Sequence, residues 1–381
     1  EDDDDMSAGD GFFKLLNEVE NEDLVFTLET IVDKFGEEIA PYAVGLCQNL
    51  AAAFWKCMNA EEEDEDDDDM GALAAVGCLR AVSTILESVA TLPELFPQLE
   101  AIMLPVLQRM LTVEGQDVYE EILDIISYFT YFGKGPISPQ MWTLFPVMCK
   151  SMDEWALDYF DNVLVPMDNF VSKGTEVFVT CKDPDYLQMT FHICTKVLGD
   201  PTIQEMDAIP APKLIESIFQ NCRGMVDQWL DPYISLAVQR MHLGGKEEDK
   251  PERMFFRDLL MQVVANALYY NAGLTIQVLA ARGMLGPVFQ EWMTMIFKAG
   301  RKEGSKAPHF KREHDKKVNV LGLVSLLSVP PQSLPAELQQ GYPQVVGGVV
   351  KLLSDLKALY EKQEEEGSDE DDDDDASGGM G

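Results

Sequence analysis

The four histidines are the residues best suited to acid–base or metal chemistry, and their surroundings argue against both. His192 lies within an apolar helical pattern, which is typical of a packed or rim residue. His242 precedes a Gly-Gly helix stop and is expected to interact with a helix C-terminus. His309 and His314 lie in a basic segment with no cysteine nearby, so the sequence does not predict a zinc site there.

The motifs that would indicate a catalytic or nucleotide-binding site do not occur. Gly244-Gly245-Lys246 is followed by Glu247 and does not complete a G-x-x-x-x-G-K-[ST] loop. Neither G-x-G-x-x-G nor G-x-S-x-G occurs. The aspartate runs lack the alternating ligands and turn glycine of an EF-hand, so they predict diffuse cation condensation. We therefore predict that the chain is not an enzyme and holds no cofactor or metal.

Cysteine and tryptophan are expected to serve packing. The seven cysteines form no C-x-x-C pair, and most lie in apolar helical patterns, which favours a reducing compartment such as cytosol or nucleus. They are Cys47, Cys57, Cys78, Cys149, Cys181, Cys194 and Cys222. Tryptophans could line a peptide groove, but in helical repeats they more often pack in the core. Of Trp55, Trp142, Trp155, Trp229 and Trp292, we expect Trp142 and Trp155 to be partly exposed, because polar or acidic residues flank them.

Acidic residues are concentrated in three runs of a chain whose net charge is −38. Residues 1–5, 61–69 and 361–375 hold five, nine and eleven acids, the last with one lysine, and so account for 24 of the 38 charges. Such runs repel themselves, and we expect them to be disordered. Phosphate binding needs a basic surface, so nucleic acid is not expected as a direct partner. Basic proteins are the natural partners.

Apolar residues recur at helical spacing nearly everywhere, as in Val118, Ile122, Ile125 and Phe129. Helix starts are marked by a capping side chain before a proline, which has no backbone N–H to leave unsatisfied. These pairs are Ser138-Pro139, Asp183-Pro184, Asp200-Pro201 and Asp231-Pro232. No run of 18 apolar residues occurs, so no membrane insertion is predicted.

The helices group into about seven pairs, and stacked pairs can bury apolar stripes that one pair alone cannot. The predicted pairs are 21–60, 71–112, 117–152, 154–199, 210–243, 251–299 and 315–365. We therefore predict an all-α superhelical solenoid of HEAT-repeat type, with an irregular all-α globular domain as the alternative. We also expect a piece of a longer protein, because the chain starts at Glu1 rather than Met.

The predicted organisation has three parts. Residues 1–11 are an acidic disordered end, and residues 12–360 are the helical array. An acidic insertion at 61–69 and a basic loop at 298–317 interrupt the array. Residues 361–381 are a disordered acidic tail.

A series of short segments carries a family resemblance over about residues 12–360. The segments are Asn21-Glu22-Asp23-Leu24, Tyr119-Glu120-Glu121-Ile122, Ser138-Pro139-Gln140-Met141-Trp142, Asp158-Tyr159-Phe160, Ala267-Leu268-Tyr269-Tyr270-Asn271, His314-Asp315-Lys316-Lys317 and Val320-Leu321-Gly322-Leu323. In this order and spacing they resemble the C-terminal half of the importin seven and eight branch of the importin-β (karyopherin) family.

The resemblance implies a HEAT solenoid that shuttles between cytoplasm and nucleus and carries cargo through nuclear pores. It implies control by the small GTPase Ran and contact with Phe-Gly nucleoporins, both through the full-length protein. It also implies basic cargoes such as ribosomal proteins and histones. A HEAT-repeat scaffold subunit and an acidic histone chaperone are the alternatives from other classes.

Two sets of residues are predicted to act in this function. Acidic side chains are expected to steer basic cargo through their long-range field. They are Glu61, Glu62, Glu63, Asp64, Glu65, Asp66, Asp67, Asp68, Asp69, Asp371, Asp372 and Asp373. Ser368 is followed directly by the acids of residues 369–375 and is predicted to be a substrate for an acidophilic kinase, with an unmodified linker serine as the alternative.

Overall fold

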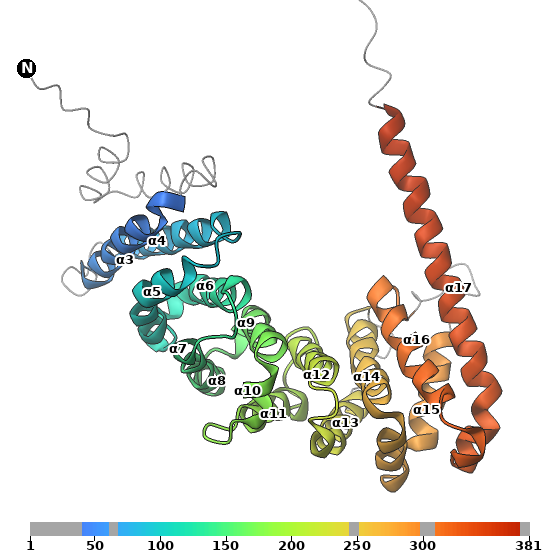
Figure 1. The fold of residues 1–381 in the computed structure, drawn as a ribbon. Coiled ribbons are helices and arrows are strands. Elements are labelled where there is room, and N and C mark those ends of the chain that lie inside the picture. Colours follow the sequence, from blue (N-terminus) through green and yellow to red (C-terminus); the bar gives the residue numbers. More distant parts are fainter. Residues whose placement is uncertain (1–39, 61–67, 244–250, 298–308, 374–381) are drawn as a thin grey trace, which may run out of the picture. The chain divides into compact units, whose positions relative to one another are not determined.

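A computed structural model describes residues 40–60, 68–243, 251–297 and 309–373, and these residues form helices and turns without a strand. The chain divides into two compact units, residues 1–193 and 194–381. In each unit, helices follow one another as stacked pairs (Figure 1). The all-α class predicted from the apolar periodicity is thus confirmed.

Unit 1 stacks its helices so that α3 packs on α4, α4 on α6 and α6 on α9. Its elements are α3 (Ala43–Ala60), α4 (Asp68–Ser88), α5 (Phe96–Met110), η2 (Val113–Val118), α6 (Tyr119–Phe132), α7 (Pro139–Trp142), α8 (Leu144–Glu154), η3 (Leu157–Tyr159), α9 (Phe160–Lys173), α10 (Thr175–Thr180) and α11 (Tyr186–Gly199), which continues into unit 2. Within α4, Gly71–Ser88 is long and apolar enough to span a membrane. Its apolar stripe, which includes Leu79 and Leu86, is buried in the core of unit 1.

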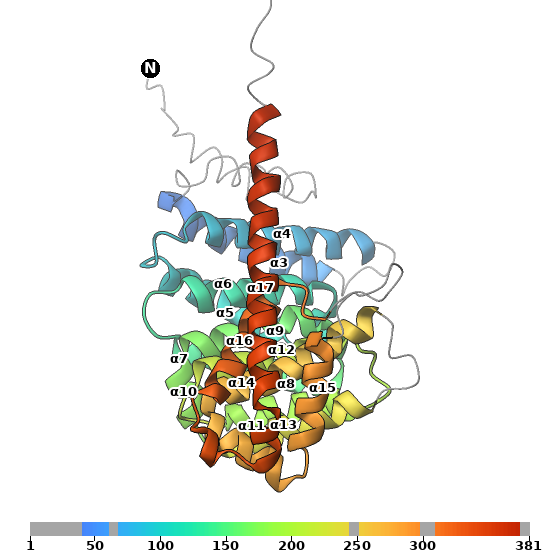
Figure 2. The same ribbon diagram turned by 90° about the vertical axis from the view of Figure 1, so that its right-hand side faces the viewer.

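Unit 2 repeats this arrangement: α12 packs on α14, α14 on α16, and α15 on α17. Its elements are α12 (Pro210–Asn221), α13 (Asp227–His242), α14 (Pro251–Ala281), α15 (Leu285–Phe297), α16 (Glu313–Leu327), η4 (Pro331–Ser333) and α17 (Ala336–Asp373). Helix α17 is the longest of them, and Figure 2 shows it extending past the other helices of the unit.

Helix α14 is two helices in one. At Asn271 the backbone leaves the helical region, with φ −157° and ψ 94°. The Asn271 side-chain carbonyl accepts the backbone N–H of Leu274 at 3.0 Å, which is how an asparagine caps a new helix. Asn271 therefore divides α14 into two helical segments.

Hydrogen bonds between successive pairs reveal the repeat length. In unit 1, Asn169 bonds the Ser127 carbonyl, 42 residues earlier. In unit 2, Tyr270 donates to Asp227, 43 residues earlier. Separations of this size match the helix-pair period of HEAT and armadillo arrays.

Only part of the capping prediction holds. Ser138 caps α7 by accepting the Met141 backbone N–H at 3.0 Å. The predictions that helices start at Asp183-Pro184, Asp200-Pro201 and Asp231-Pro232 are wrong. Helix α11 begins at Tyr186 with Asp185 accepting the Gln188 N–H, turns follow Asp200, and α13 begins earlier than Asp231, at Asp227. The Asp231 carboxylate instead accepts hydrogen bonds from the Ser235 hydroxyl and the Arg282 guanidinium.

Two predicted irregular segments are partly helical. Acidity predicts disorder from residue 361 onward, but α17 continues to Asp373. A helix already formed adds one hydrogen bond per residue without a new nucleation cost, and glutamate is a good helix former. Residues 298–317 were expected to be a basic loop, but α16 begins at Glu313, because burial of Phe310 and Val318 favours order there.

Several predictions fall outside the described residues. These concern the acidic end 1–11, most of the first helix of the pair 21–60, residues 61–67 of the acidic insertion, residues 298–308 of the basic loop and residues 374–381 of the tail.

Helices α14 and α16 approach so closely that only glycine fits at position 322. A Cβ on Gly322 would lie 2.6 Å from the Ala265 carbonyl oxygen and 2.7 Å from the Ala265 Cα, and backbone cannot yield cheaply. We expect Gly322→Ala to lower the free energy of unfolding of unit 2 by about 1–3 kcal/mol, as measured by urea denaturation. Gly341→Ala in α17 is the control: its Cβ meets nothing within 4 Å, so helix propensity should make it neutral or stabilising. Equal behaviour of the two variants would contradict the close approach.

Candidate binding surfaces

A ladder of polar side chains, buried except for Gln220 at its edge, crosses unit 2 and fixes the positions of its helices. On α12, Gln220 donates to Asn266 of α14 at 3.0 Å. One turn earlier on α14, Gln262 donates to Asp315 of α16 at 2.8 Å. Asn319 of α16 then accepts the indole N–H of Trp292 at 2.6 Å. Unpaired buried polar groups are costly, so this ladder penalises any shift of one helix against the next.

The segment before α16 is anchored by a second buried carboxylate. Asp258 of α14 contacts the His309 imidazole at 2.5 Å and accepts the Phe310 backbone N–H at 2.9 Å. Burial raises the pKa of Asp258, while the hydrogen bond and charge of His309 oppose that rise. Phe310 adopts φ 53° and is buried. The end of the predicted basic loop is therefore docked in the core.

His314 links helices that are two repeats apart. Its Nε2 lies 2.6 Å from the Glu216 carboxylate of α12, 98 residues earlier. The hydrogen bond to Glu216 raises the pKa of His314, and burial partly opposes it. Asp315 also raises this pKa and Arg312 lowers it. The pair thus ties α16 to α12 across α14, and it strengthens when His314 is protonated.

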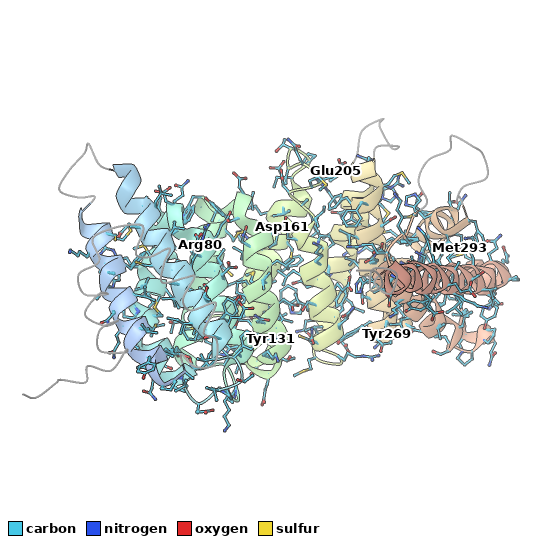
Figure 3. All side chains as sticks on the ribbon, turned by 90° about the horizontal axis from the view of Figure 1, so that it is seen from above. Arg80, Tyr131, Asp161, Glu205, Tyr269 and Met293 are labelled. Atoms are coloured by element: carbon cyan, nitrogen blue, oxygen red, sulfur yellow. The ribbon has the colours of Figure 1, made fainter. Side chains whose placement is uncertain are left out.

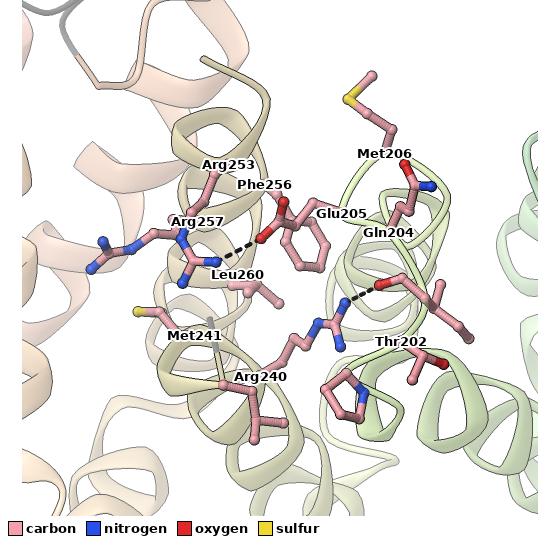
Figure 4. A pocket seen from close by; sticks show the side chains of 13 residues that line it. Thr202, Gln204, Glu205, Met206, Arg240, Met241, Arg253, Phe256, Arg257 and Leu260 are labelled. Carbon is pink, nitrogen blue, oxygen red and sulfur yellow. Dashed lines mark hydrogen bonds and ion pairs between the residues drawn. The ribbon is translucent and has the colours of Figure 1, made fainter. Parts of the chain in front are cut away.

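An arginine-lined pocket of about 530 Å³ lies between α13, the start of α14 and the turn at residues 201–206. Arg240 donates to the carbonyl oxygens of Asp200 at 2.5 Å and Ile203 at 2.6 Å. Arg253 donates to Glu205 at 2.7 Å, as Figure 4 shows. Glu205 lies at one edge of unit 2 and Tyr269 at the opposite edge (Figure 3).

The pocket carries positive charge within an acidic chain. Burial lowers the pKa of Arg240, whose described partners are carbonyl groups rather than a carboxylate. The Nε groups of Arg253 and Arg257 are buried without a hydrogen-bond acceptor among the described residues. Such donors suit a carbonyl or carboxylate ligand. The first role of Arg240 is nevertheless structural, since it fastens the turn at 201–206 to α13.

An apolar groove of about 590 Å³ runs between α15 and α17. Phe289, Met293 and Phe297 of α15 form one wall. Leu338 and Val345 of α17 form the other, and Gly341 leaves open space between them. Phe297 is 47% exposed, so aromatic surface is available to a ligand. The groove can accommodate an apolar side chain from a partner.

The described part of the predicted steering residues lies on two helices, one in each unit. Asp68 and Asp69 form the first turn of α4, and Asp371, Asp372 and Asp373 form the last turn of α17. Ser368 is also within α17 rather than in a linker. Glu61–Asp67 lie outside the described residues. Their steering role remains a prediction.

The expectations for the aromatic and histidine side chains are met in part. Trp142 was expected to be partly exposed, and this is wrong: it is 5% exposed and packs against Phe170 and Tyr186. Trp155 is half-buried. His192 is an exposed rim residue, as predicted, and His242 contacts the Val238 carbonyl near the end of α13.

Most of the cysteine side chains are buried, as small hydrophobic side chains are. Five of the seven are buried, and none is in a disulfide. Burial raises the pKa of Cys47, Cys194 and Cys222 to about 12, so each is a neutral thiol. Among the described residues, no three His, Cys, Asp or Glu side chains are grouped as metal ligands would be.

Comparison with curated proteins gives relatives along nearly the whole chain. "Importin beta-like SAD2 homolog" of Arabidopsis thaliana is 48% identical over 344 residues, 90% of this chain and 32% of that protein. "Probable importin-7 homolog" of Dictyostelium discoideum is 33% identical over 93% of the chain, and importin-8 of Danio rerio is 30% identical over 91% of it. The chain covers 32% of the length of each of these two proteins. The chain is homologous to importin-β-like proteins. It fits the importin-7 and importin-8 branch and the C-terminal part of those proteins.

The homology accounts for the stacked helix pairs and confirms the predicted HEAT-repeat fold. The chain spans about a third of the length of the curated relatives it matches. No family model matches it, and no solved structure matches it either. The importin-β-like assignment therefore rests on sequence identity and on the helical fold.

Substitution of Arg240 tests how much its hydrogen bonds to the turn at residues 201–206 stabilise unit 2. Arg240→Met keeps most of the aliphatic stem but leaves the Asp200 and Ile203 carbonyls without their donor. We expect the free energy of unfolding of unit 2 to fall by about 1.5–3 kcal/mol, as for hydrogen bonds from a charged group. The control is Arg282→Met, which breaks the pair with Asp231 in which both side chains are exposed; it should change stability little. Similar losses for both variants in urea denaturation would contradict a specific role for Arg240.

The His314–Glu216 pair predicts a pH dependence of stability. Because the folded pKa of His314 is raised above 6.5, its stabilisation is complete below that pH and is lost as pH rises through the folded pKa. We expect wild type to be more stable than His314→Asn at about pH 6, and the difference to shrink by about pH 8.5, since the neutral ring binds Glu216 less strongly. Thermal unfolding of both proteins between about pH 6 and pH 8.5 measures this stability difference. A difference that stays constant with pH would contradict the proposed link between His314 protonation and stability.

Proposed function

We propose that this chain is the cargo-binding portion of a nuclear import receptor. The single observation that carries the proposal is the 48% identity over 90% of the chain with an importin-β-like protein. Stacked helix pairs with exposed faces suit a binding protein rather than an enzyme. The receptor would shuttle between cytoplasm and nucleus, with Ran in its GTP form releasing the cargo.

Basic proteins, such as ribosomal proteins and histones, are the proposed cargo. The net charge of −38 favours them. Residues 61–69 and 371–373 would act mainly on encounter, because a long-range field can raise association rates by about 10–1,000-fold at low salt. Specific holding needs packed contacts, since exposed ion pairs contribute only about 0–1 kcal/mol each. Phosphate on Ser368 would add negative charge to the same end of α17.

The groove between α15 and α17 is the proposed contact for Phe-Gly nucleoporins. Its walls include Phe289, Met293, Leu338 and Val345 together with polar side chains, and its aromatic residue Phe297 is exposed. No atom lies within 4 Å of the position that a Cβ at Gly341 would take, so an inserted phenyl ring would find open space there. Gly341→Leu would fill this space without a backbone clash and would favour the helix.

Cargo release by Ran tests the class of function. The full-length receptor is immobilised and incubated with a basic ribosomal protein, with and without Ran loaded with GTP. We expect the cargo to bind and Ran-GTP to release it, whereas Ran-GDP should not. Binding that Ran-GTP leaves unchanged would favour a scaffold or a histone chaperone and would contradict the import proposal.

The same protein tests the pore contact. We expect Gly341→Leu to weaken binding to an immobilised Phe-Gly repeat peptide while cargo binding and thermal stability stay unchanged. Gly341→Ala is the matched control, because its methyl group is too small to fill the groove. Equal peptide binding by wild type and Gly341→Leu would remove this groove from the proposal.

A further inference from the structure

Exposed apolar side chains gather on the last two helices of unit 2. Sixteen large hydrophobic side chains are exposed among the described residues, and six of them lie on α16 and α17. These six are Leu321, Val324, Val346, Val350, Leu353 and Tyr360, and they define the α16–α17 face. Contiguous apolar surface of this kind marks interaction sites on soluble proteins.

The members on α17 have coiled-coil spacing. Val346, Val350 and Leu353 follow one another at four and three residues, and Tyr360 comes seven residues later. This period of 3.5 residues keeps the side chains on one stripe. The stripe is separate from the buried one, whose members include Val345 and Leu352. Helix α17 therefore has one apolar stripe for its own unit and a second that faces solvent.

Tyr360 joins this second stripe to α16. Its hydroxyl donates to the Glu313 carboxylate at 2.7 Å, and the Lys317 ammonium lies 5.8 Å from the centre of its ring. The part of α17 around Tyr360 thus lies beside the start of α16, so the two helices run antiparallel. Leu321 lies one turn beyond Lys317 on the same face of α16. Leu321 and Val324 therefore extend along the stretch of α16 that borders Leu353 and Val350.

Charge marks the far end of the stripe. Residues 361–373 of α17 hold nine acidic residues and one lysine, a net charge of −8. Acids at a helix C-terminus oppose the helix dipole, and like charges four residues apart repel each other. A basic segment beside them would relieve both effects. The stripe and its continuation are thus complementary to a helix that is apolar on one face and basic beyond it.

We propose that the α16–α17 face binds an amphipathic α-helix of a partner protein that carries lysine or arginine next to its apolar stripe. The apolar stripe of the partner packs along Val346, Val350 and Leu353, and its basic residues lie beside residues 361–373. A second copy of the chain is the weaker occupant, because its own charge of −38 is repelled. The inference does not depend on nuclear transport.

The test uses a fluorescent synthetic peptide of about three heptads with a leucine stripe and lysines elsewhere. Its affinity for the full chain is measured by anisotropy at about 0.15 M salt, where the Debye length of about 8 Å limits non-specific attraction. We expect Val350→Gln with Leu353→Gln to weaken binding at least about tenfold, since two aliphatic contacts are lost. Val113→Gln with Val165→Gln, which alters exposed valines of unit 1, should bind as wild type does.

Two further peptides separate the apolar and basic requirements. A peptide of the same composition with its leucines scrambled off the stripe should bind at least about tenfold more weakly. A peptide with glutamate in place of lysine should not bind. Thermal unfolding confirms that each variant is folded, and both substituted positions on α17 are exposed.

Three results would overturn the proposal. The first is equal weakening by the α17 variant and the unit 1 control, and the second is equal binding of the striped and scrambled peptides. The third is self-association in sedimentation that only Val350→Gln with Leu353→Gln removes, which would identify a second copy as the occupant. None of these measurements involves Ran or pore proteins, so this proposal and the import proposal fail separately.

Discussion

The polar ladder from Gln220 through the buried Gln262 and Asp315 to Trp292 is the constraint on which unit 2 depends. Apolar packing alone would let a helix slide or rotate by a turn at modest cost, because one leucine contact resembles the next. Directional bonds between buried side chains do not allow this. The ladder therefore defines the register in which α12, α14, α16 and α15 stack, and the surface features follow from that register.

The same register brings distant charges into pairs. His314 reaches Glu216 across 98 residues only because α14 places α12 and α16 at a fixed offset. Gly322 belongs to the same arrangement, since the contact with Ala265 allows no side chain there. Asp258, His309 and Phe310 extend the order into the segment before α16. Unit 2 is thus held by a few specific contacts superimposed on a general apolar core.

The three surfaces of unit 2 described above differ in where they lie relative to the helix pairs. The groove between α15 and α17 is an indentation between neighbouring helices, whereas the α16–α17 face is the outer side of the last pair described. The arginine pocket differs from both, because its main cation, Arg240, is already engaged by backbone carbonyls.

The sequence by itself determined the helical class, most helix positions and the family resemblance, because 3.6-residue apolar periodicity is a local signal. It also identified the acidic runs, because their charge follows from the residue types alone. Only the tertiary structure decided that Trp142 is buried, that residues 309–317 dock through Asp258 and Asp315, and that α17 continues beyond Tyr360. The first two outcomes depend on contacts between residues far apart in the sequence, such as Trp142 with Tyr186 and Asp258 with His309, and local patterns carry no information about such partners. The continuation of α17 depends on a helix that packing has already formed, from which further residues add hydrogen bonds without a new nucleation cost.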